Sequence, residues 1–384
     1  MKILMVAYTE YLSDARPRRE AEALASRGDE VDFVALAERD KPLMETVAGV
    51  NLFRTRVQRF RGSNNLAYVL AYLKFFVAAH LMVWRLARKK RYSIVQVHTM
   101  PDFLVFAAII PKLQSAKIVL DVHDAMPELY ATKFGVPMTH WLIRLITLQE
   151  RLSAAFADRI LAVHEPHKRM LVSHGIPASK ITCIMNVPDE KLFRNGDRGA
   201  SKECFLVYHG TLAYRFGLDL AVRAFVKVKN SVPGAKFRIF GDGDYLPELK
   251  NLIRELKLDD DIFLSGKMHP VDEIPNLIKD AALAVIPNRK DAFTDKILPV
   301  KLLEYVTMGI PVVITRTSAV EEYFHGSLLY IESGDVEGLA NAMIGMLKNP
   351  SLREQYAENA SAFNERFNWS QQKSTYFSLL DSLK

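Results

Sequence analysis

The chain has 384 residues, of which 49% are hydrophobic and 25% are charged, so it is long enough for two folded domains. It contains only two cysteines, Cys183 and Cys204, and its opening MKILMVAY is typical of a short buried strand rather than of a secretion signal. We therefore expect a protein of the reducing cytoplasm. The formal net charge of +7 leaves a nucleic acid, a membrane surface or a small anionic substrate as its partner.

Short β-rich runs alternate with helical patterns along the chain. In the first half the expected strands are residues 3–6, 31–35, 94–98, 118–122, 159–163 and 181–185. The alternation then restarts with strands at 205–208, 237–240, 262–265, 282–286, 312–315 and 328–331. Strands that alternate with helices form parallel sheets covered on both faces. The fold class that we expect is α/β, with two tandem doubly wound, Rossmann-like domains.

Residues 186–201 separate the two series and are rich in proline, glycine and polar side chains. We expect this segment to be the linker between an N-terminal domain, residues 1–190, and a C-terminal domain, residues 200–365. Doubly wound domains bind ligands at the carboxyl ends of their strands. The expected active site is therefore a cleft between two facing domains.

An apolar run, residues 66–84, is bracketed by positive charge. The basic residues are Arg54, Arg56, Arg59 and Arg61 before it, and Arg85, Arg88, Lys89, Lys90 and Arg91 after it. Three interpretations stay open: a membrane span, which Lys74 and His80 would interrupt; a long helix packed on a sheet; and a surface helix that touches anionic lipid.

The segment HGTLAYRFG, residues 209–217, follows the first expected strand of the second domain. A glycine-bearing turn after a strand presents backbone N–H groups, and the guanidinium of Arg215 beside it adds a fixed positive fork. Together they could hold a diphosphate. The alternative is that Arg215 is a solvated loop charge.

His123 and Asp124 directly follow the expected strand 118–122. This position lies on a strand's carboxyl end, where sites in such folds occur, and an imidazole there could hydrogen-bond a substrate hydroxyl or carbonyl. The alternative is a structural histidine at the end of a strand.

Residues 299–309, PVKLLEYVTMG, have the proline start and glycine stop of a short helix. Glu304 on this helix could accept hydroxyls of a ribose, or it could pair locally. The turn at Val300 and Lys301 offers N–H groups to a phosphate. Gly241 opens a Gly-Asp-Gly turn that we place near a nucleobase. The spacing shows no metal-ligand set, no Walker loop and no nucleophile elbow, so a reaction without a metal or cofactor is expected.

Six blocks of this chain resemble the retaining nucleotide-sugar glycosyltransferases of glycosyltransferase family 4, which have the GT-B fold. They are LDVHDAMPEL at 120–129, ADRILAV at 157–163, KITCIMN at 180–186 with Asp189, YHGTL at 208–212, FGDG at 240–243, and KLLEYVTMGIPVV at 301–313. Their order and spacing cover nearly the whole chain.

This resemblance implies an enzyme whose C-terminal domain binds a nucleotide-diphosphate sugar and whose N-terminal domain takes the acceptor. It implies that His123 approaches the transferred sugar, that Glu304 binds the ribose, and that a last helix, residues 366–384, packs back on the N-terminal domain. We assign catalytic roles to His123 and Arg215. The expected donor contacts are Gly210, Thr211, Arg215, Gly241, Met268, Val300, Lys301 and Glu304.

The chain departs from the family pattern at three places. The family's first glutamate, eight residues before Glu304, is Lys296 here. The Arg and Lys pair after the first strand of the second domain is replaced by Thr211 and Phe216, which leaves Arg215 as the nearest cation. The glycine pair of the first loop is replaced by residues 8–18, YTEYLSDARPR.

The resemblance implies retaining transfer of a sugar to an acceptor hydroxyl, and the missing metal-ligand spacing predicts that it needs no metal. The basic residues and apolar helix between residues 54 and 91 fit a polyprenyl-linked saccharide as the acceptor, in surface polysaccharide or glycolipid synthesis. The basic residues Arg85–Arg91 would then contact the inner face of the cytoplasmic membrane, and no nucleic acid partner is expected. A nucleotide-sugar epimerase and a noncatalytic nucleotide-sugar-binding protein remain as alternatives. The nucleotide, the sugar, the linkage and the oligomeric state stay open.

Overall fold

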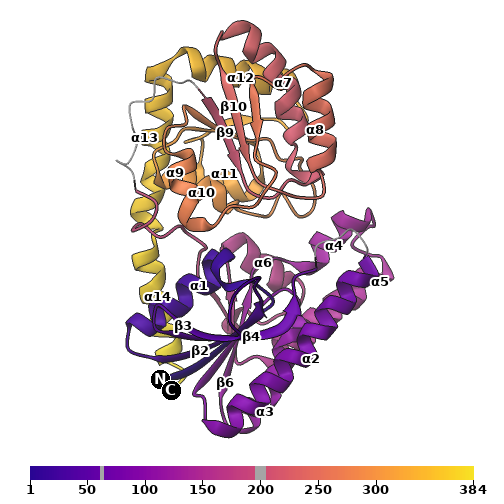
Figure 1. The fold of residues 1–384 in the computed structure, drawn as a ribbon, viewed down its shortest axis with the longest axis vertical. Coiled ribbons are helices and arrows are strands. Elements are labelled where there is room, and N and C mark those ends of the chain that lie inside the picture. Colours follow the sequence, from indigo (N-terminus) through magenta and orange to yellow (C-terminus); the bar gives the residue numbers. More distant parts are fainter. Residues whose placement is uncertain (61–64, 195–204) are drawn as a thin grey trace. The chain divides into compact units, whose positions relative to one another are not determined.

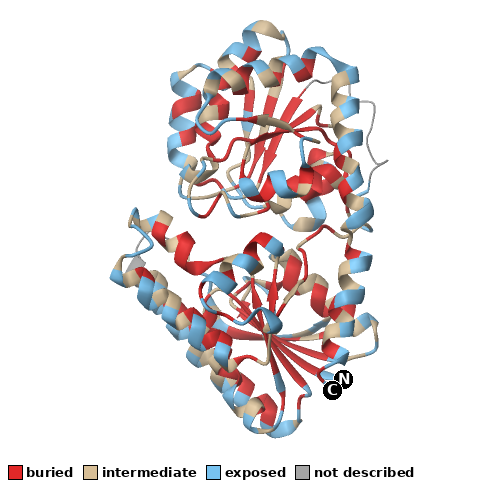
Figure 2. Cartoon of the chain, turned by 180° about the vertical axis from the view of Figure 1, so that it is seen from behind, coloured by how far each residue is buried: buried red, intermediate tan, exposed pale blue. Residues whose placement is uncertain are grey.

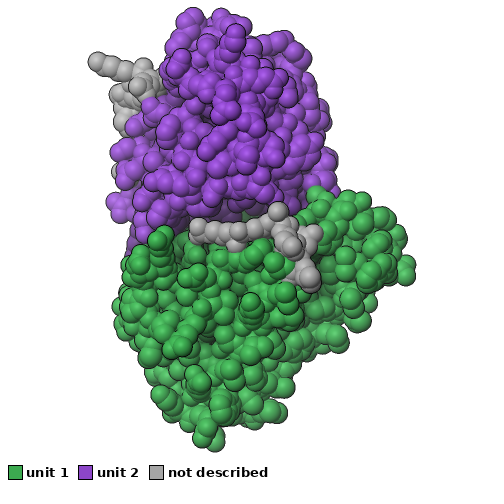
Figure 3. Space-filling view, turned by 45° about the vertical axis from the view of Figure 1, so that its right-hand side comes forward, with its two compact units in different colours: residues 1–186, 370–384 green, residues 187–369 purple. Residues whose placement is uncertain are grey.

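The computed structural model describes residues 1–60, 65–194 and 205–384. Arg61, Cys204 and residues 195–201 of the expected linker therefore lie outside the described residues. The chain divides into two compact units, residues 1–186 with 370–384, and residues 187–369 (Figures 1 and 3). The residues at the end of the chain thus belong to the same unit as its beginning.

Unit 1 is built on an eight-stranded sheet in the order β3-β4-β2-β1-β5-β6-β7-β8. Among the described strands of this sheet, only the β3–β4 pair is antiparallel. The six strands expected here are confirmed, whereas the β3–β4 hairpin was not predicted. The strands are β1 Lys2–Ala7, β2 Glu30–Ala37, β3 Met44–Val47, β4 Val50–Gln58, β5 Ile94–His98, β6 Lys117–Val122, β7 Arg159–Ala162 and β8 Ile181–Cys183.

Helices cover both faces of this sheet, and each face has its own hydrophobic core. One core includes Phe75, Ala79 and Val83 from the long helix α2, and the other includes Tyr376 and Leu380 from α14 at the end of the chain. The helices are η1 Tyr11–Ser13, α1 Ala15–Ser26, α2 Asn65–Lys89, η2 Asp102–Ala108, α3 Ile109–Leu113, α4 Met126–Phe134, α5 Trp141–Phe156, α6 Glu165–Ser173, η3 Ala178–Lys180 and α14 Trp369–Asp381.

Unit 2 has a six-stranded parallel sheet in the order β11-β10-β9-β12-β13-β14. All six expected strands are confirmed. They are β9 Phe205–His209, β10 Lys236–Phe240, β11 Ile262–Leu264, β12 Leu283–Ile286, β13 Val312–Thr315 and β14 Leu329–Ile331. The chain order reverses between β9 and β12, and open parallel sheets bind ligands at the carboxyl ends of the strands at such a point.

The helices of unit 2 follow the strands in alternation, as a doubly wound fold requires. They are η4 Tyr214–Phe216, α7 Leu218–Ser231, α8 Leu246–Glu255, η5 Val271–Glu273, α9 Ile274–Ile278, α10 Val300–Thr307, α11 Ser318–Phe324, α12 Val336–Lys348 and α13 Pro350–Arg366. Figure 2 shows that the strands are mostly buried, whereas the outward faces of the helices are exposed. Both halves of the chain therefore have the α/β, Rossmann-like architecture expected from the sequence.

Two of the basic residues that flank the apolar run, Arg54 and Lys90, are paired with carboxylates. Arg54 is buried on β4 and pairs with Glu38 and Glu45, so it is a core ion pair and not a surface charge. Lys90 contacts Glu30 and Asp32. The interpretation of these two residues as free surface charge is wrong, because β2, the residue that follows it and β3 supply their carboxylates.

Candidate functional site

The loop after β9 packs tightly on the loop after β10. A Cβ on Gly241 would lie 1.9 Å from the carbonyl oxygen of Gly210, and one on Gly243 would lie 2.1 Å from that of Leu212. The two backbones can approach this closely only with glycine in both places. The amide of Gly241 already donates to Ser265 Oγ at 2.9 Å. The Gly-Asp-Gly turn thus has a packing role at this edge of the sheet.

Gly210 leaves room for a lysine from another element. Its φ is +116°, and a Cβ there would lie 3.1 Å from Cε and 3.2 Å from Nζ of Lys301. Lys301 stands in the first turn of α10, and its Nζ donates to the hydroxyl of Tyr208 at 2.7 Å. The ammonium also lies 4.2 Å from the ring centroid of Tyr208 and 4.8 Å from that of Phe216. The loop after β9 and α10 therefore form one site.

Burial weakens the charge of this lysine. It lowers the pKa of Lys301 to about 7, although the carboxylate of Glu304 acts in the opposite direction. A cation with this pKa is half protonated near neutral pH. A bound diphosphate would favour the charged form, because an anion stabilises an ammonium nearby.

Arg215 lies in η4, where its guanidinium faces the rings of Phe216 and Phe293 at 5.5 and 5.8 Å. Its Nε is buried and has no hydrogen-bond partner among the described residues. Arg289 holds the backbone around it: the Arg289 amide donates to the carbonyl of Arg215 at 2.9 Å, and its guanidinium makes two 2.7 Å bonds to Asp219. Arg289 is neutralised, whereas Arg215 remains available to an anion.

Glu304 is buried on α10 and bonds a histidine that ends β9. The carboxylate of Glu304 only accepts, so His209 Nε2 carries a proton and donates to Glu304 Oε2 at 2.6 Å. In the neutral ring Nδ1 then accepts from the Tyr305 hydroxyl at 2.8 Å, and that hydroxyl oxygen accepts from the amide of His209 at 3.0 Å. The other carboxylate oxygen, Oε1, makes no hydrogen bond within the described part of the chain, so it can accept from a ligand hydroxyl.

Lys296, where the resemblance implies a glutamate, is held by Asp295 and Ser318. Burial alone would raise the pKa of Asp295, but the amide and hydroxyl of Ser318, with Lys296 and Lys290, lower it to about 2. The Nζ of Lys296 lies 3.2 Å from Asp295 and 3.1 Å from Ser318 Oγ. Lys296 is therefore held by the next helix, α11.

The remaining predicted donor contacts are open to solvent. Thr211 is exposed and Met268 is 56% exposed, while Val300 is half-buried at the start of α10.

Asn288, which follows β12 at the reversal point, has a buried Oδ1 that finds no partner among the described residues. A buried acceptor of this kind usually has a donor in the functional state.

In unit 1, His123 follows β6 and sits at the rim of a buried ionic cluster. Its Nε2 lies 3.1 Å from Asp121 Oδ2, and the backbone amide donates to Thr99 Oγ1 at 3.1 Å. Arg16 binds both oxygens of Asp121, at 2.9 and 2.7 Å. Burial would lower the pKa of His123, but the carboxylate of Asp121 outweighs it and raises that pKa.

One side-chain nitrogen or oxygen atom from each of His98, Asp121 and His123 lies within 4.8 Å of the other two. Three metal ligands could have this spacing. The sequence pattern had not indicated this group, because its members come from two strands. The guanidinium of Arg16 already occupies both oxygens of Asp121, and a metal cation beside it would be repelled. The donor set therefore fits a hydrogen-bond network better than a metal.

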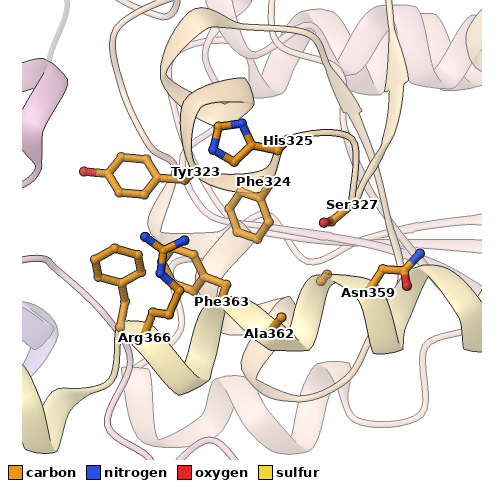
Figure 4. A pocket seen from close by; sticks show the side chains of 10 residues that line it. Tyr323, Phe324, His325, Ser327, Asn359, Ala362, Phe363 and Arg366 are labelled. Carbon is orange, nitrogen blue, oxygen red and sulfur yellow. The ribbon is translucent and has the colours of Figure 1, made fainter.

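A small hollow lies between α11 and α13 (Figure 4). It has a volume of about 130 Å³ and is lined by aromatic side chains that include Tyr323, Phe324 and Phe363. Small-molecule sites usually enclose roughly 300 Å³ or more. This hollow is too small for a nucleotide sugar, and none of the predicted site residues lines it.

The outward faces of α2 and α5 are apolar. On α2 they comprise Val69, Leu70, Leu73, Val77, Leu81 and Trp84, and on α5 they comprise Trp141, Leu145, Leu148 and Leu152. Each of these side chains is at least 38% exposed. We call this set the apolar face of unit 1.

Both helices pack on η2, where Phe103 contacts Phe76 of α2 and Phe106 contacts Phe156 of α5. Among the described residues, α2 alone is long and apolar enough to cross a membrane. Its inner side belongs to the core of unit 1, which favours a helix that lies on the sheet.

Comparisons with known proteins agree with this architecture. Residues 14–186 match the family described as "Glycosyl transferase 4-like domain", and residues 189–363 match "Glycosyl transferases group 1". The N-acetyl-alpha-D-glucosaminyl L-malate synthase of Bacillus anthracis is 24% identical over 349 residues, which are 88% of this chain and 84% of that protein.

Two further proteins are similar to the chain. The exopolysaccharide phosphotransferase SCO2592 of Streptomyces coelicolor is 34% identical over 223 residues, but these are 56% of this chain and only 22% of that protein. The structure of Anabaena HepE in complex with UDP superposes with a TM-score of 0.70 at 17% identity, over 100% of both chains. Because both halves match glycosyltransferase families and the fold is shared, the chain belongs to the GT-B glycosyltransferases of the family 4-like type.

Proposed function

We propose that this glycosyltransferase transfers a sugar with retention of configuration and without a metal ion, from a nucleotide-diphosphate sugar to a saccharide acceptor carried on a lipid. The observation that carries the proposal is the pairing of Arg215, whose Nε has no partner among the described residues, with the partly protonated Lys301 at the carboxyl end of β9. Arg215 and Lys301 both lie over the ring of Phe216, so one diphosphate could contact both cations.

The donor would bind at the carboxyl edge of the sheet of unit 2. Its diphosphate would lie between Arg215 and Lys301, near the first amides of α10, which have no acceptor inside the helix. Its ribose hydroxyls would donate to Glu304 Oε1, since Oε2 already accepts from His209. Lys301 thus supplies the second cation that the loop after β9 lacks at Phe216.

Transfer would be driven by stabilisation of the leaving group. The bond from the anomeric carbon to the diphosphate breaks, and negative charge grows on the phosphate oxygen near Arg215 and Lys301. The acceptor hydroxyl forms the new bond from the same face and gives its proton to the departing phosphate oxygen. No protein base is needed, because the departing phosphate takes the proton. The two cations supply the positive charge that a metal would otherwise contribute. His123 would contact the transferred sugar.

A donor screen tests this proposal. Thermal unfolding should be shifted upwards by one class of nucleotide sugar, because a ligand that binds only the folded chain stabilises it. The product of transfer with an α-linked donor should have an α-linkage, which the coupling constant of the anomeric proton reports. A β-linked product would contradict retention, and full activity after exhaustive chelation would support a metal-independent reaction.

The pKa of Lys301 predicts how donor binding depends on pH. The amine is charged below its pKa of about 7 and neutral above it, so affinity for a nucleotide sugar should fall roughly five- to tenfold between pH 6 and pH 8. Titration calorimetry with a nucleotide sugar measures this, because its diphosphate diester has no ionisation in that range. Lys301→Arg keeps the charge at both pH values and should remove the dependence. The same dependence in Lys301→Arg would show that another group causes it.

The apolar face of unit 1 supports a lipid-linked acceptor. Residues 51–100 contain ten lysines and arginines and no aspartate or glutamate. Four of these, Arg85, Arg88, Lys89 and Arg91, are exposed at the end of α2, and Arg144 and Arg151 are exposed on α5. Apolar helices edged by basic side chains bind anionic membrane surfaces. We infer that unit 1 lies on the inner face of the cytoplasmic membrane, where a polyprenyl-diphosphate saccharide would be within reach.

Charge reversal should release the protein from the membrane. Changing Arg85, Arg88, Lys89 and Arg91 to glutamate should weaken binding to anionic phospholipid vesicles by roughly 100-fold or more, since each basic residue contributes about 1 kcal/mol. Sedimentation with vesicles measures the bound fraction. As a matched control, four exposed lysines of unit 2, Lys227, Lys250, Lys257 and Lys348, are changed in the same way. Equal binding by the wild type and the α2 variant would contradict the membrane contact.

A further inference from the structure

A chain of buried polar side chains leads from the last helix of the protein to His123. It starts at Tyr376 on α14, passes Gln96 and His98 on β5, and ends at Asp121, the partner of His123. Tyr376, Gln96 and Asp121 are fully buried and His98 is 1% exposed. Polar groups so far from water keep fixed hydrogen-bond directions, because an unpaired donor or acceptor is costly there.

The direction of the first bonds follows from the chemistry of Gln96. The hydroxyl of Tyr376 donates to Gln96 Oε1 at 2.5 Å, and Gln96 Nε2 donates to Glu20 Oε2 at 2.7 Å. A carboxylate can only accept, which places the amide nitrogen at Glu20 and the amide oxygen at Tyr376. The second hydrogen of Nε2 then faces His98 Nε2, 3.4 Å away. His98 must therefore accept on Nε2.

This fixes the tautomer of His98. A neutral imidazole that accepts on Nε2 carries its proton on Nδ1. That proton points to Asp121 Oδ2 at 3.0 Å, and the same oxygen lies 3.1 Å from His123 Nε2. Since Asp121 only accepts, His123 directs a protonated Nε2 towards it. The remaining nitrogen of His123, Nδ1, is the one left for a ligand.

We propose that Gln96 and Tyr376 are positioning residues that set the proton arrangement of His98 and Asp121, so that His123 always holds Nε2–H on Asp121 and exchanges a proton only at Nδ1. This deepens the proposed function, because it rests on His123 lying at the transferred sugar. With its proton, Nδ1 would donate to an oxygen of the sugar or of the departing phosphate. The last helix of the chain would thereby control the chemistry of a residue on β6.

The surroundings of His123 are consistent with this assignment. The charged and titratable groups around it are Asp121 and His98 on the sheet, Arg16, Asp14 and Glu20 at α1, and His167 on α6. Asp121 favours the doubly protonated ring and raises the pKa of His123, whereas burial and Arg16 oppose this. The proton that leaves first is the one on Nδ1, because the proton on Nε2 is held by the carboxylate.

Nuclear magnetic resonance of the full-length protein with ¹⁵N-labelled histidine rings tests the arrangement directly. The spectra should show His98 protonated on Nδ1, and His123 protonated on Nε2 at every pH from about 6 to 9 with Nδ1 titrating. Signals are assigned from His98→Gln and His123→Gln. His98 protonated on Nε2, or His123 losing the Nε2 proton first, would overturn the proposal. This outcome is independent of any transfer assay, so it separates failure of the relay from failure of the proposed function.

A pair of tyrosine variants tests the part played by α14. Tyr376→Phe should leave Gln96 Oε1 without a donor, give a mixture of His98 tautomers and lower kcat about tenfold without changing the donor KM. Tyr92→Phe is the control, because Tyr92 is a buried tyrosine of the same unit whose hydroxyl donates to Asp32 at 2.5 Å, outside this network. A folded Tyr376→Phe protein with the wild-type tautomer and pH profile would contradict the role of Tyr376.

Discussion

Replacing Arg215 with alanine should lower kcat for sugar transfer by roughly 100- to 1,000-fold, which is about 3–4 kcal/mol of transition-state stabilisation. The guanidinium has a buried Nε with no partner in the described chain, so it binds a growing negative charge without first giving up another bond. Charge on the departing diphosphate is greatest in the transition state, and the effect should therefore appear in kcat more than in KM. Steady-state transfer kinetics measure both constants.

Two further variants separate this role from general loss of positive charge. Arg223 is an exposed arginine on α7 of the same unit, and Arg223→Ala should leave kcat within about twofold. Arg215→Lys keeps the charge but loses the fork, so it should recover only part of the activity. A kcat for Arg215→Ala close to that of Arg223→Ala would mean that the diphosphate lies elsewhere.

Replacing Glu304 with alanine should raise the donor KM by roughly 10- to 150-fold, because a ribose would lose a charged acceptor, worth about 1.5–3 kcal/mol for such a hydrogen bond. The same change leaves the buried Nε2–H of His209 without its 2.6 Å partner and should also lower the melting temperature. Calorimetry with the nucleotide sugar and with inorganic diphosphate distinguishes the two contributions.

The comparison between ligands makes this prediction specific. Glu304→Ala should weaken binding of the nucleotide sugar but leave inorganic diphosphate binding nearly unchanged, whereas Arg215→Ala should weaken both. Glu248→Ala, at an exposed position of α8, is the matched control for loss of a glutamate. Equal losses for nucleotide sugar and diphosphate in Glu304→Ala would contradict the assignment of Glu304 to the ribose.

The fold could be predicted from the sequence because parallel strands are buried on both faces. Runs such as residues 3–6 and 282–286 are continuously apolar, and that pattern is strong even in a single sequence. The β3–β4 hairpin was missed for the opposite reason. Its strands mix polar with apolar residues, and β4 carries Arg54 and Arg56, which suggested surface charge instead. Its turn at Ala48 and Gly49 has positive φ at both residues, and only Gly49 is a usual turn signal.

The sequence could predict which loops and which helix carry the site residues, but not the contacts between them. Arg215 and Lys301 both lie over the ring of Phe216, as two of the predicted donor contacts should if they share a site. Gly210 packs against Lys301, and Glu304 is on the same helix as Lys301. The contacts that tune them were not predicted, because they join residues far apart in sequence. His209 and Glu304 are 95 residues apart, and Arg16 and Asp121 are 105 apart. The sequence placed His209 at the end of a strand and in the YHGTL block, but it gave no sign of the bond to Glu304.

One measurement tests the central claim, that the cations at the carboxyl end of β9 hold an activated sugar for transfer to a lipid-linked saccharide. The wild type and Arg215→Ala are incubated with a panel of radiolabelled nucleotide sugars and with vesicles that carry a polyprenyl-diphosphate saccharide, and the lipid and water phases are then separated. We predict that label from one nucleotide sugar enters the lipid phase with the wild type only, and that no donor is consumed without the acceptor. An isomerised nucleotide sugar formed without acceptor, or a donor that binds and is never transferred, would contradict the account.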